Sequence, residues 1–159
     1  MKATTLLREQ HRRLDGLLVR VESEHGQARL AMMLQLVEEL LTHLSLEDHV
    51  FLRGVADETG MRLETYRVEQ GEVRNALLQA VFAEQDEPRF ADRLRDLGIE
   101  MRHHARVMER DVLGLVESQV PARDLEAMGE RMLRYWDAAV GGGQVGPPPP
   151  SASHVHAAE

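Results

Sequence analysis

The spacing of apolar residues is the feature that most restricts the fold of this 159-residue chain. Leucine, valine and methionine recur every three or four positions, which is the spacing of one face of an α-helix. Glycine, proline and polar turns separate four such segments, over about 4–25, 27–53, 61–84 and 88–119. No stretch alternates apolar and polar residues for long enough to predict a strand. The sequence therefore predicts an all-α fold.

The four long segments are joined by short connectors, which predicts an up-down-up-down antiparallel four-helix bundle. A short fifth helix begins at Val120 and Pro121 and ends near Ala139. We expect it to be too short and too late in the chain for a full bundle member, and to lie across one end or one face. After Gly141 the composition collapses to GGGQVGPPPPSASHVHAAE, which has too little apolar content to fold. We therefore predict one domain over 1–140 and a disordered C-terminal tail over 141–159.

The composition excludes several classes of function. The chain has no cysteine, which rules out disulfides, thiolate zinc sites, iron–sulfur clusters and cysteine nucleophiles. Its net charge of -8 has the wrong sign for a protein that binds nucleic acid through phosphate contacts. No apolar run approaches the roughly 18 residues of a membrane helix, and no export signal is evident. We expect a cytoplasmic protein without a nucleic-acid or membrane partner.

Polar residues interrupt the apolar stripe of every long segment. A buried charge or an unpaired imidazole is costly, so such residues must satisfy one another or hold something. They are His11 in the first segment, His43 and Glu47 in the second, Tyr66 and Gln70 in the third, and His104 and Glu109 in the fourth. His43 and Glu47 are four residues apart and therefore project from the same side of their helix.

The depth of these residues along their helices favours a common layer. At about 1.5 Å per residue, His11, His43 and Gln70 lie about 12 to 15 Å from the helix ends that would be adjacent in an antiparallel bundle. Glu109 and His104 lie about 13 and 21 Å from the end of the longer fourth helix. Within the error of the predicted helix ends, all four helices bring polar residues to one level.

Two interpretations of this layer remain open. A histidine on an apolar face is often a hydrogen-bonded core residue, and His43 with Glu47 could form a surface pair. Agreement in depth among four helices instead favours a metal site. Three imidazoles and two carboxylates suit a first-row transition metal, iron or zinc in particular. Carboxylates on two helices could also bridge two ions.

With these residues placed, the chain resembles the hemerythrin-like, or HHE cation-binding, family over about residues 4–138. The matching segments are EQHRRLDGLL around His11, THLSLEDHVFL around His43 and Glu47, and RHHARVMERDVL around His104 and Glu109. The resemblance implies a four-helix bundle with a non-haem centre of two iron ions, oxo- and carboxylate-bridged. Glu47 and Glu109 would be the bridges, and the three histidines would be terminal ligands.

The third helix departs from the family pattern. The family has histidine at the position of Gln70 and, in its oxygen carriers, a second histidine at that of Tyr66. Tyr66 would supply a hard anionic donor that favours Fe(III), whereas Gln70 offers a neutral amide, and Glu69 could swing in from the edge of the stripe. His49 and His103 lie just off the layer, where they either support the ligands or face solvent.

This ligand change argues against reversible O2 carriage, which needs a histidine-rich di-ferrous centre. We expect a di-iron protein that reacts with or senses O2, peroxide or NO, with peroxide decomposition as a candidate activity. The alternative is a non-catalytic interaction or regulatory bundle with a structural or degenerate metal site; metal storage is a third option. The expected partner is the small molecule, and the chain is expected to be a monomer or a weak homo-oligomer.

Overall fold

The protein is described by a computed structural model that covers residues 1–83 and 87–142. Every regular element in this part of the chain is a helix, so the predicted all-α class is confirmed. The elements are α1 (Ala3–Ser23), α2 (Gly26–Leu46), η1 (Glu47–Leu52), α3 (Arg53–Thr59), α4 (Leu63–Ala83), α5 (Glu87–Val107), η2 (Met108–Leu113), α6 (Gly114–Gln119) and α7 (Ala122–Gly142). The segments η1 and η2 are turns of π-helix inside longer helices.

The second predicted helix extends further than its glycine suggested. We expected it to stop at Arg53, before Gly54, but α2, η1 and α3 form one continuous helical rod that ends at Thr59. Gly60 ends the rod in the left-handed conformation, with φ of 65°. Gly54 instead lies where α7 packs closely, because a Cβ atom there would lie 2.7 Å from Cε of Met128, the flexible end of that side chain. A glycine inside a helix can therefore mark a close approach and not a boundary.

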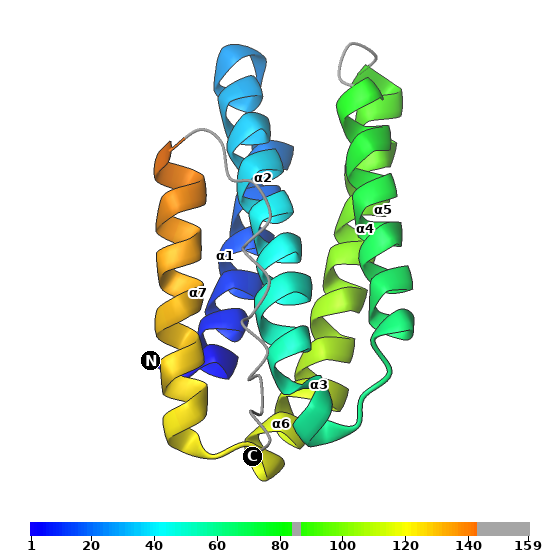
Figure 1. Ribbon diagram of the computed structural model, residues 1–159. Helices are drawn as coiled ribbons and strands as arrows, with labels where there is room; N and C mark the ends of the chain where they lie inside the picture. The colour runs from blue at the N-terminus through cyan, green and yellow to red at the C-terminus, as the bar shows by residue number, and fades with distance from the viewer. Residues whose placement is uncertain (84–86, 143–159) are drawn as a thin grey trace, which may run out of the picture.

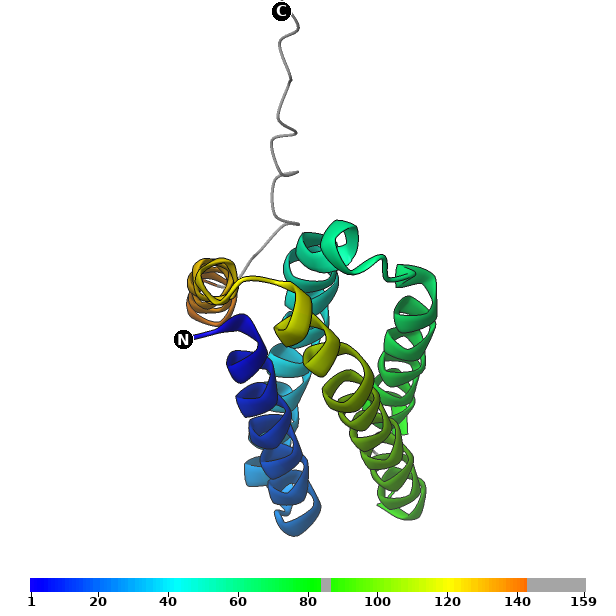
Figure 2. The same cartoon turned by 90° about the horizontal axis from the view of Figure 1, so that it is seen from below.

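The long helices pack as antiparallel neighbours. α1 packs against α2 and α4 packs against α5, as Figure 1 shows. α1 also contacts α5. The expected shortness of the fifth helix is wrong, because α7 has 21 residues, as many as α1. Of the two placements that we expected, one end or one face, α7 takes the face, where it packs along both α1 and α2. Seen from below, α7 lies on the far side of α1 and α2 from α4 (Figure 2). It covers one side of the bundle because its own apolar face must be buried.

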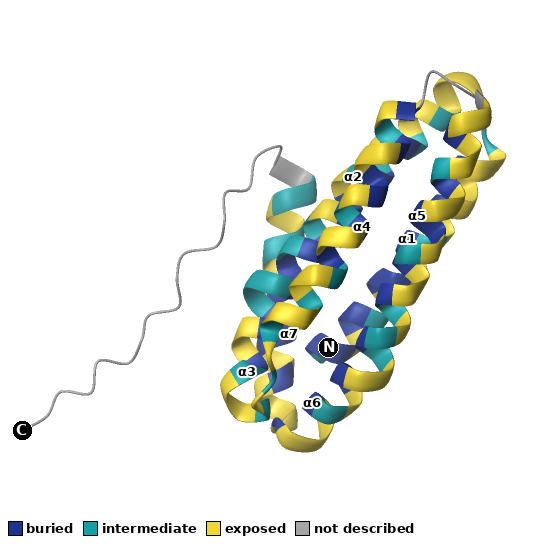
Figure 3. Ribbon diagram, turned by 90° about the vertical axis from the view of Figure 1, so that its right-hand side faces the viewer, coloured by how far each residue is buried: buried dark blue, intermediate teal, exposed yellow. Residues whose placement is uncertain are grey.

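The core consists of two apolar clusters, one toward each end of the bundle. The first apolar cluster includes Leu14, Leu18, Leu36, Leu40, Val73, Leu77, Leu97 and Met101. The second apolar cluster includes Leu7, Leu46, Phe51, Leu52, Met108, Val112, Met128 and Met132. Figure 3 shows the buried residues on the faces that the helices turn toward one another. The chain crosses from one cluster to the other between Leu7 and Leu14, and again between Met101 and Met108.

Those crossings hold the polar residues. His11 lies midway between Leu7 and Leu14, and His104 lies between Met101 and Met108. Both histidines are buried. The helices therefore place a polar layer inside an otherwise apolar core, and this layer is the site described next.

Two further predictions concern the ends and the surroundings of the chain. The predicted tail over 141–159 coincides at its start with the last two residues of α7, and the rest lies outside the residues that the structure describes. Within 1–83 and 87–142, no helix combines the length and the apolar character needed to cross a membrane.

Candidate metal centre

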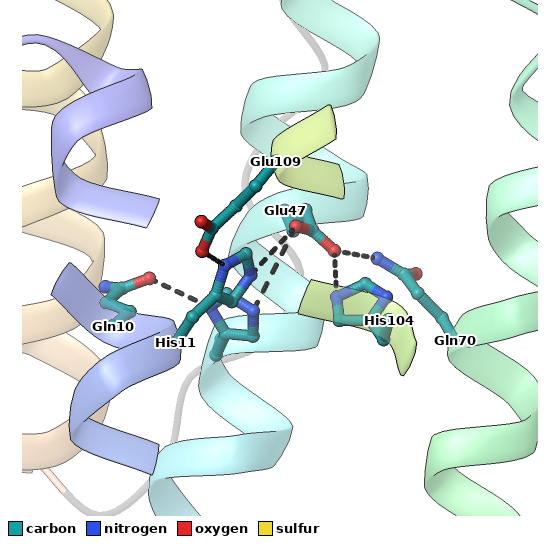
Figure 4. Close-up of polar contacts among 7 residues, drawn as sticks. Gln10, His11, Glu47, Gln70, His104 and Glu109 are labelled. Carbon is teal, nitrogen blue, oxygen red and sulfur yellow. Dashed lines mark hydrogen bonds and ion pairs between the residues drawn. The ribbon is translucent and has the colours of Figure 1, made fainter. Parts of the chain in front are cut away.

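Three imidazoles meet in the polar layer, each from a different helix. The ring centres of His11 and His43 are 4.9 Å apart, and that of His104 lies 5.7 and 6.0 Å from the other two. The ring planes are nearly perpendicular to one another. One possible ligand atom from each histidine and one from Glu47 all lie within 4.8 Å of one another. Four donors thus surround a single small space (Figure 4).

Glu47 is the one carboxylate fully buried in this layer. Its Oε1 atom lies 3.9 Å from His11 Nε2 and 4.0 Å from His43 Nε2, and its Oε2 atom lies 3.0 Å from His104 Nε2. Burial by itself raises the pKa of Glu47, but the imidazole of His104, through its charge and its hydrogen bond, lowers it below its ordinary value. The carboxyl group is therefore ionised and can serve as a ligand.

Two of the histidines are oriented through their outer nitrogen atoms. His11 Nδ1 lies 2.9 Å from Glu109 Oε1, and His43 Nδ1 lies 2.9 Å from Gln10 Oε1. Both partners are acceptors, so each Nδ1 carries the proton and donates it. The Nε2 atoms of His11 and His43 then present lone pairs to the space beside Glu47. Metal-binding histidines are commonly held in this way.

The inward atoms have no hydrogen-bond partners. Nε2 of His11, Nε2 of His43, Oε1 of Glu47 and Nδ1 of His104 are buried without a hydrogen-bond partner, whereas Nε2 of His104 contacts Glu47 Oε2. Burial lowers the pKa of His43 to about 3 and also lowers that of His11, which keeps these two rings neutral. Unpaired buried polar atoms are costly, and a cation among them would satisfy several at once. The residues present therefore fit one metal ion.

A comparison with protein families agrees with this geometry. A model of the family described as the hemerythrin HHE cation binding domain matches residues 2–116 of the chain. The chain belongs to the hemerythrin HHE cation-binding family. No curated protein and no solved structure matches it. The family resemblance drawn from the sequence is confirmed, and the matched region contains all four converging side chains.

Two π-helical turns adapt the backbone of this hemerythrin-like chain to the site. η1 begins at Glu47, and η2 begins at Met108, one residue before Glu109. Residues five apart, such as His104 and Glu109, would point about 140° apart on a regular α-helix. The wider π turn reduces that divergence, and such turns are frequent at functional sites. Glu109 can therefore reach the polar layer from the same helical rod as His104.

The remaining predicted ligands occupy different surroundings. Glu109 is 40% exposed and contacts the outer nitrogen of His11, not the space among the four donors. Gln70 is buried, and its Nε2 atom donates a hydrogen bond of 2.8 Å to Glu47 Oε2. Tyr66 is half-buried and packs against the second apolar cluster. Within the described residues, no second group of three or more histidine, aspartate or glutamate side chains converges at the further iron position that the resemblance implies.

The three supporting residues that we expected contact other groups. His49 Nδ1 donates to the backbone carbonyl of Ser45 on its own helix, at 3.0 Å. His103 is exposed, and its Nε2 atom lies 3.9 Å from Glu69 Oε1. The second carboxylate oxygen of Glu69 is buried and without a hydrogen bond. None of these three residues has a hydrogen bond or ion pair with the four converging side chains, but Glu69 is close enough for its charge to act on His104. Burial lowers the pKa of His104, whereas the carboxylates of Glu47 and, more weakly, Glu69 raise it above its ordinary value.

Gln10 is a residue of the site that the sequence analysis missed. It is buried and holds His43 by the hydrogen bond described above. A signal was available, because Gln10 lies three residues after Leu7 and four before Leu14, within the buried stripe of α1.

A small cavity adjoins the three imidazoles. Its volume is about 30 Å³, and its apolar walls include Leu14, Leu40, Val73 and Met101. His11, His43 and His104 also line it, whereas Glu47 does not. This volume accommodates one or two molecules the size of water.

The outer boundary of this cavity is an ion pair at the surface. Asp15 of α1 and Arg102 of α5 both line the cavity, and Arg102 Nε donates to Asp15 Oδ1 at 2.8 Å. Both side chains are about half exposed. The cavity therefore leads from the histidines toward solvent between α1 and α5.

Proposed function

We propose that this hemerythrin-like domain binds iron at the polar layer and reacts with, or senses, a small molecule such as O2, peroxide or NO. The observation that carries the proposal is the cavity beside the three imidazoles. A cation held there by His11, His43, His104 and Glu47 would border a space that a small molecule can enter.

The donor set supports iron as the cation. Imidazole and carboxylate ligands suit iron and zinc, and the family is one of cation-binding domains. Bound iron would supply one-electron redox chemistry at this position. The three imidazoles and Glu47 would hold the ion. Gln10 orients the ring of His43, and Glu109 orients that of His11.

The character of the cavity supports an uncharged small molecule as the ligand. Its walls are mainly apolar, and Arg102 at its outer boundary already donates to Asp15, so an anion would lose its hydration with little compensation. Molecules as small as O2, NO and hydrogen peroxide fit the volume of about 30 Å³. The aliphatic walls also limit the amount of water beside the site.

The third helix argues against reversible carriage of O2. Neither Tyr66 nor Gln70 supplies an imidazole, and Gln70 donates its hydrogen bond to Glu47. The histidine-rich pair of ions that O2 carriage needs therefore lacks its ligands on α4. Reaction or sensing at the site remains the function that we propose.

Metal analysis and peroxide consumption test this proposal. Protein produced with iron supplied should contain iron, and the iron-loaded protein should consume hydrogen peroxide or bind NO spectroscopically. His43→Ala should abolish both iron retention and reactivity. His25→Ala is the matched control, since His25 is exposed at the start of α2 and its substitution should change neither. Protein without iron under these conditions would refute the proposal.

A second candidate is a regulatory bundle whose metal is structural. One observation favours it: α4 carries Leu78 and Phe82 four residues apart, 52% and 81% exposed, as an apolar surface for a partner. Trp136 of α7 packs against the second apolar cluster and is not part of this surface. This candidate predicts that the bound metal raises the melting temperature of the protein. It also predicts that the metal-loaded protein neither consumes peroxide nor binds NO.

A further inference from the structure

The two oxygens of Glu47 lie in different surroundings. Oε1 is buried without a hydrogen bond and faces the Nε2 atoms of His11 and His43. Oε2 accepts a hydrogen bond from Gln70 Nε2 at 2.8 Å and lies close to His104 Nε2. Figure 4 shows Gln70 and His104 approaching this oxygen together, opposite His11.

The contact with Gln70 conflicts with a bridging role for Glu47. A carboxylate that bridges two ions directs one oxygen at each of them. Here the amide of Gln70 occupies the outer side of Oε2 and presents hydrogen atoms there, not a lone pair. The orientation of the amide follows from its partner, since an ionised carboxylate oxygen can only accept.

The other expected bridge also faces away from a second ion. Glu109 Oε1 is engaged with His11 Nδ1, whereas the donors converge on the Nε2 side of that ring. A carboxylate on the outer nitrogen orients the ring and makes it a better donor. Its contact is therefore that of a supporting residue, not of a ligand shared by two metals.

Outside the four converging residues, the buried polar side-chain atoms without a hydrogen bond in the described part of the chain are Thr4 Oγ1, Glu69 Oε2 and Gln70 Oε1, which include no imidazole. Within 1–83 and 87–142, the only group of three or more histidine, aspartate or glutamate side chains able to hold a metal is the one already described. The buried polar residues in this part of the chain outside that group are Thr4, Gln10, Glu39 and Gln70. Glu39 is engaged with Arg13 and Gln35. A second ion would lack the ligands that the first one has.

We infer that the bundle holds one metal ion per chain, bound by His11, His43, His104 and Glu47, and that the amide of Gln70 takes the place of a second ion. The inference rests on the proposed metal binding and adds its stoichiometry. One ion exchanges single electrons with its ligand, whereas a pair can exchange two. The stoichiometry therefore determines what chemistry the site can perform.

The stoichiometry can be measured without any assay of activity. Metal-free full-length protein is titrated with Zn²⁺ by calorimetry, and iron-loaded protein is assayed for metal per chain. We expect one equivalent in both, and an electron paramagnetic resonance signal of isolated Fe(III). Two equivalents with a magnetically coupled, silent ferric pair would overturn the inference while leaving the proposed function intact. Failure to bind any metal would overturn both.

Substitution of Gln70 tests the role of the amide. Gln70→His removes the hydrogen bond to Glu47 and supplies an imidazole on α4, so the number of bound ions should rise toward two. Gln70→Ala removes the same hydrogen bond without supplying a ligand, so this variant should still bind one ion per chain. Circular dichroism verifies that both variants are folded. If folded Gln70→His still binds one ion, the amide is not what excludes the second, and that part of the inference is refuted.

Discussion

Gln10 and Glu109 each hold one imidazole of the site through its outer nitrogen. The two hydrogen bonds are 2.9 Å long and come from different helices, α1 and the rod that contains η2. They set which nitrogen carries the proton, and so which one faces the metal. Neither residue needs to contact the metal to affect its binding.

Removal of either acceptor should weaken metal binding. We expect Gln10→Ala and Glu109→Ala each to lower the affinity for Zn²⁺ by about 10- to 100-fold, because a freed ring loses its preferred tautomer and orientation. Competition titration against a chelator of known affinity measures the change. Glu117→Ala is the control, since Glu117 pairs with Arg8 at the surface and should leave the affinity unaltered. Equal Zn²⁺ affinities in all variants would contradict the orienting role of Gln10 and Glu109.

A buried carboxylate away from the site controls acid stability. Glu39 is 1% exposed and accepts hydrogen bonds from Arg13 and Gln35. Burial raises its pKa, but the hydrogen bonds from Arg13 and then Gln35 outweigh this effect and lower the pKa below its ordinary value. The stabilisation is thus complete above the unfolded pKa of about 4.3 and is lost as the pH falls through the folded value.

Arg13→Ala should remove part of this stabilisation. We expect a loss of about 1 kcal/mol in the free energy of unfolding at neutral pH, a modest value because Arg13 is itself half exposed. The difference from wild type should be larger at neutral pH than at an acidic pH below the unfolded carboxyl pKa of about 4.3, because Glu39 loses its charge as the pH falls through its lowered pKa. Urea unfolding at the two pH values measures it. A difference that stays constant with pH would contradict the linkage.

At the scale of the elements, glycines set how closely α7 approaches the rest of the molecule. A Cβ atom at Gly54 would meet Met128 of α7, and one at Gly129 of α7 would collide with the carbonyl oxygen of Met1 and lie 3.0 Å from Ala3 N. The first neighbour is the flexible end of a side chain, whereas the second is backbone. Gly129 is therefore the position at which α7 and the start of α1 are most tightly fitted.

Gly129→Ala should loosen this contact. We expect it to destabilise the protein by about 1 to 3 kcal/mol, as overpacking does, because backbone must move to admit the methyl group. Gly16→Ala in α1 is a matched control with nothing within 4 Å of the new Cβ. The same substitution there should stabilise the helix by about 0.5 to 1 kcal/mol. Melting temperatures that shift in the same direction in both variants would refute the packing argument.

At the scale of the whole molecule, the polar layer separates two apolar clusters and joins three of the packed helices. Its donors come from α1, from the rod of α2 and η1, and from α5. Without an ion, the layer leaves several buried atoms unpaired. A bound cation would connect the helices where the hydrophobic core is interrupted, so metal binding and folding should be coupled.

Removal of the metal should therefore lower the melting temperature. With free metal at about 1,000 times its dissociation constant, linkage gives about 4 kcal/mol of stabilisation. For a chain of this length that corresponds to a shift of roughly 8 to 16 °C. Differential scanning calorimetry before and after a chelator measures it. Glu47→Gln, which keeps the shape of the side chain but not its charge, should lose most of the shift; a full shift in this variant would contradict the ligand assignment.

The sequence by itself determined the helices and the level of the polar layer. Helical periodicity depends on residues near one another in the chain, so it placed His11, His43, Glu47 and His104 on inward faces at similar depth. The family could be inferred from the sequence for the same reason, because its motifs are sets of residues at fixed spacings along single helices. It could not place α7, since the position of a helix outside the bundle depends on which neighbouring surface accepts it.

Only the tertiary structure decided what each polar residue contacts. Glu109 and Gln70 were both predicted as ligands, yet one holds the outer nitrogen of His11 and the other holds an oxygen of Glu47. Such contacts depend on side-chain rotamers, on the π turns and on distances between helices that residue spacing does not encode. A shift of a few ångströms between packed helices separates a metal ligand from a supporting residue, and that shift is set by the packing of the whole core.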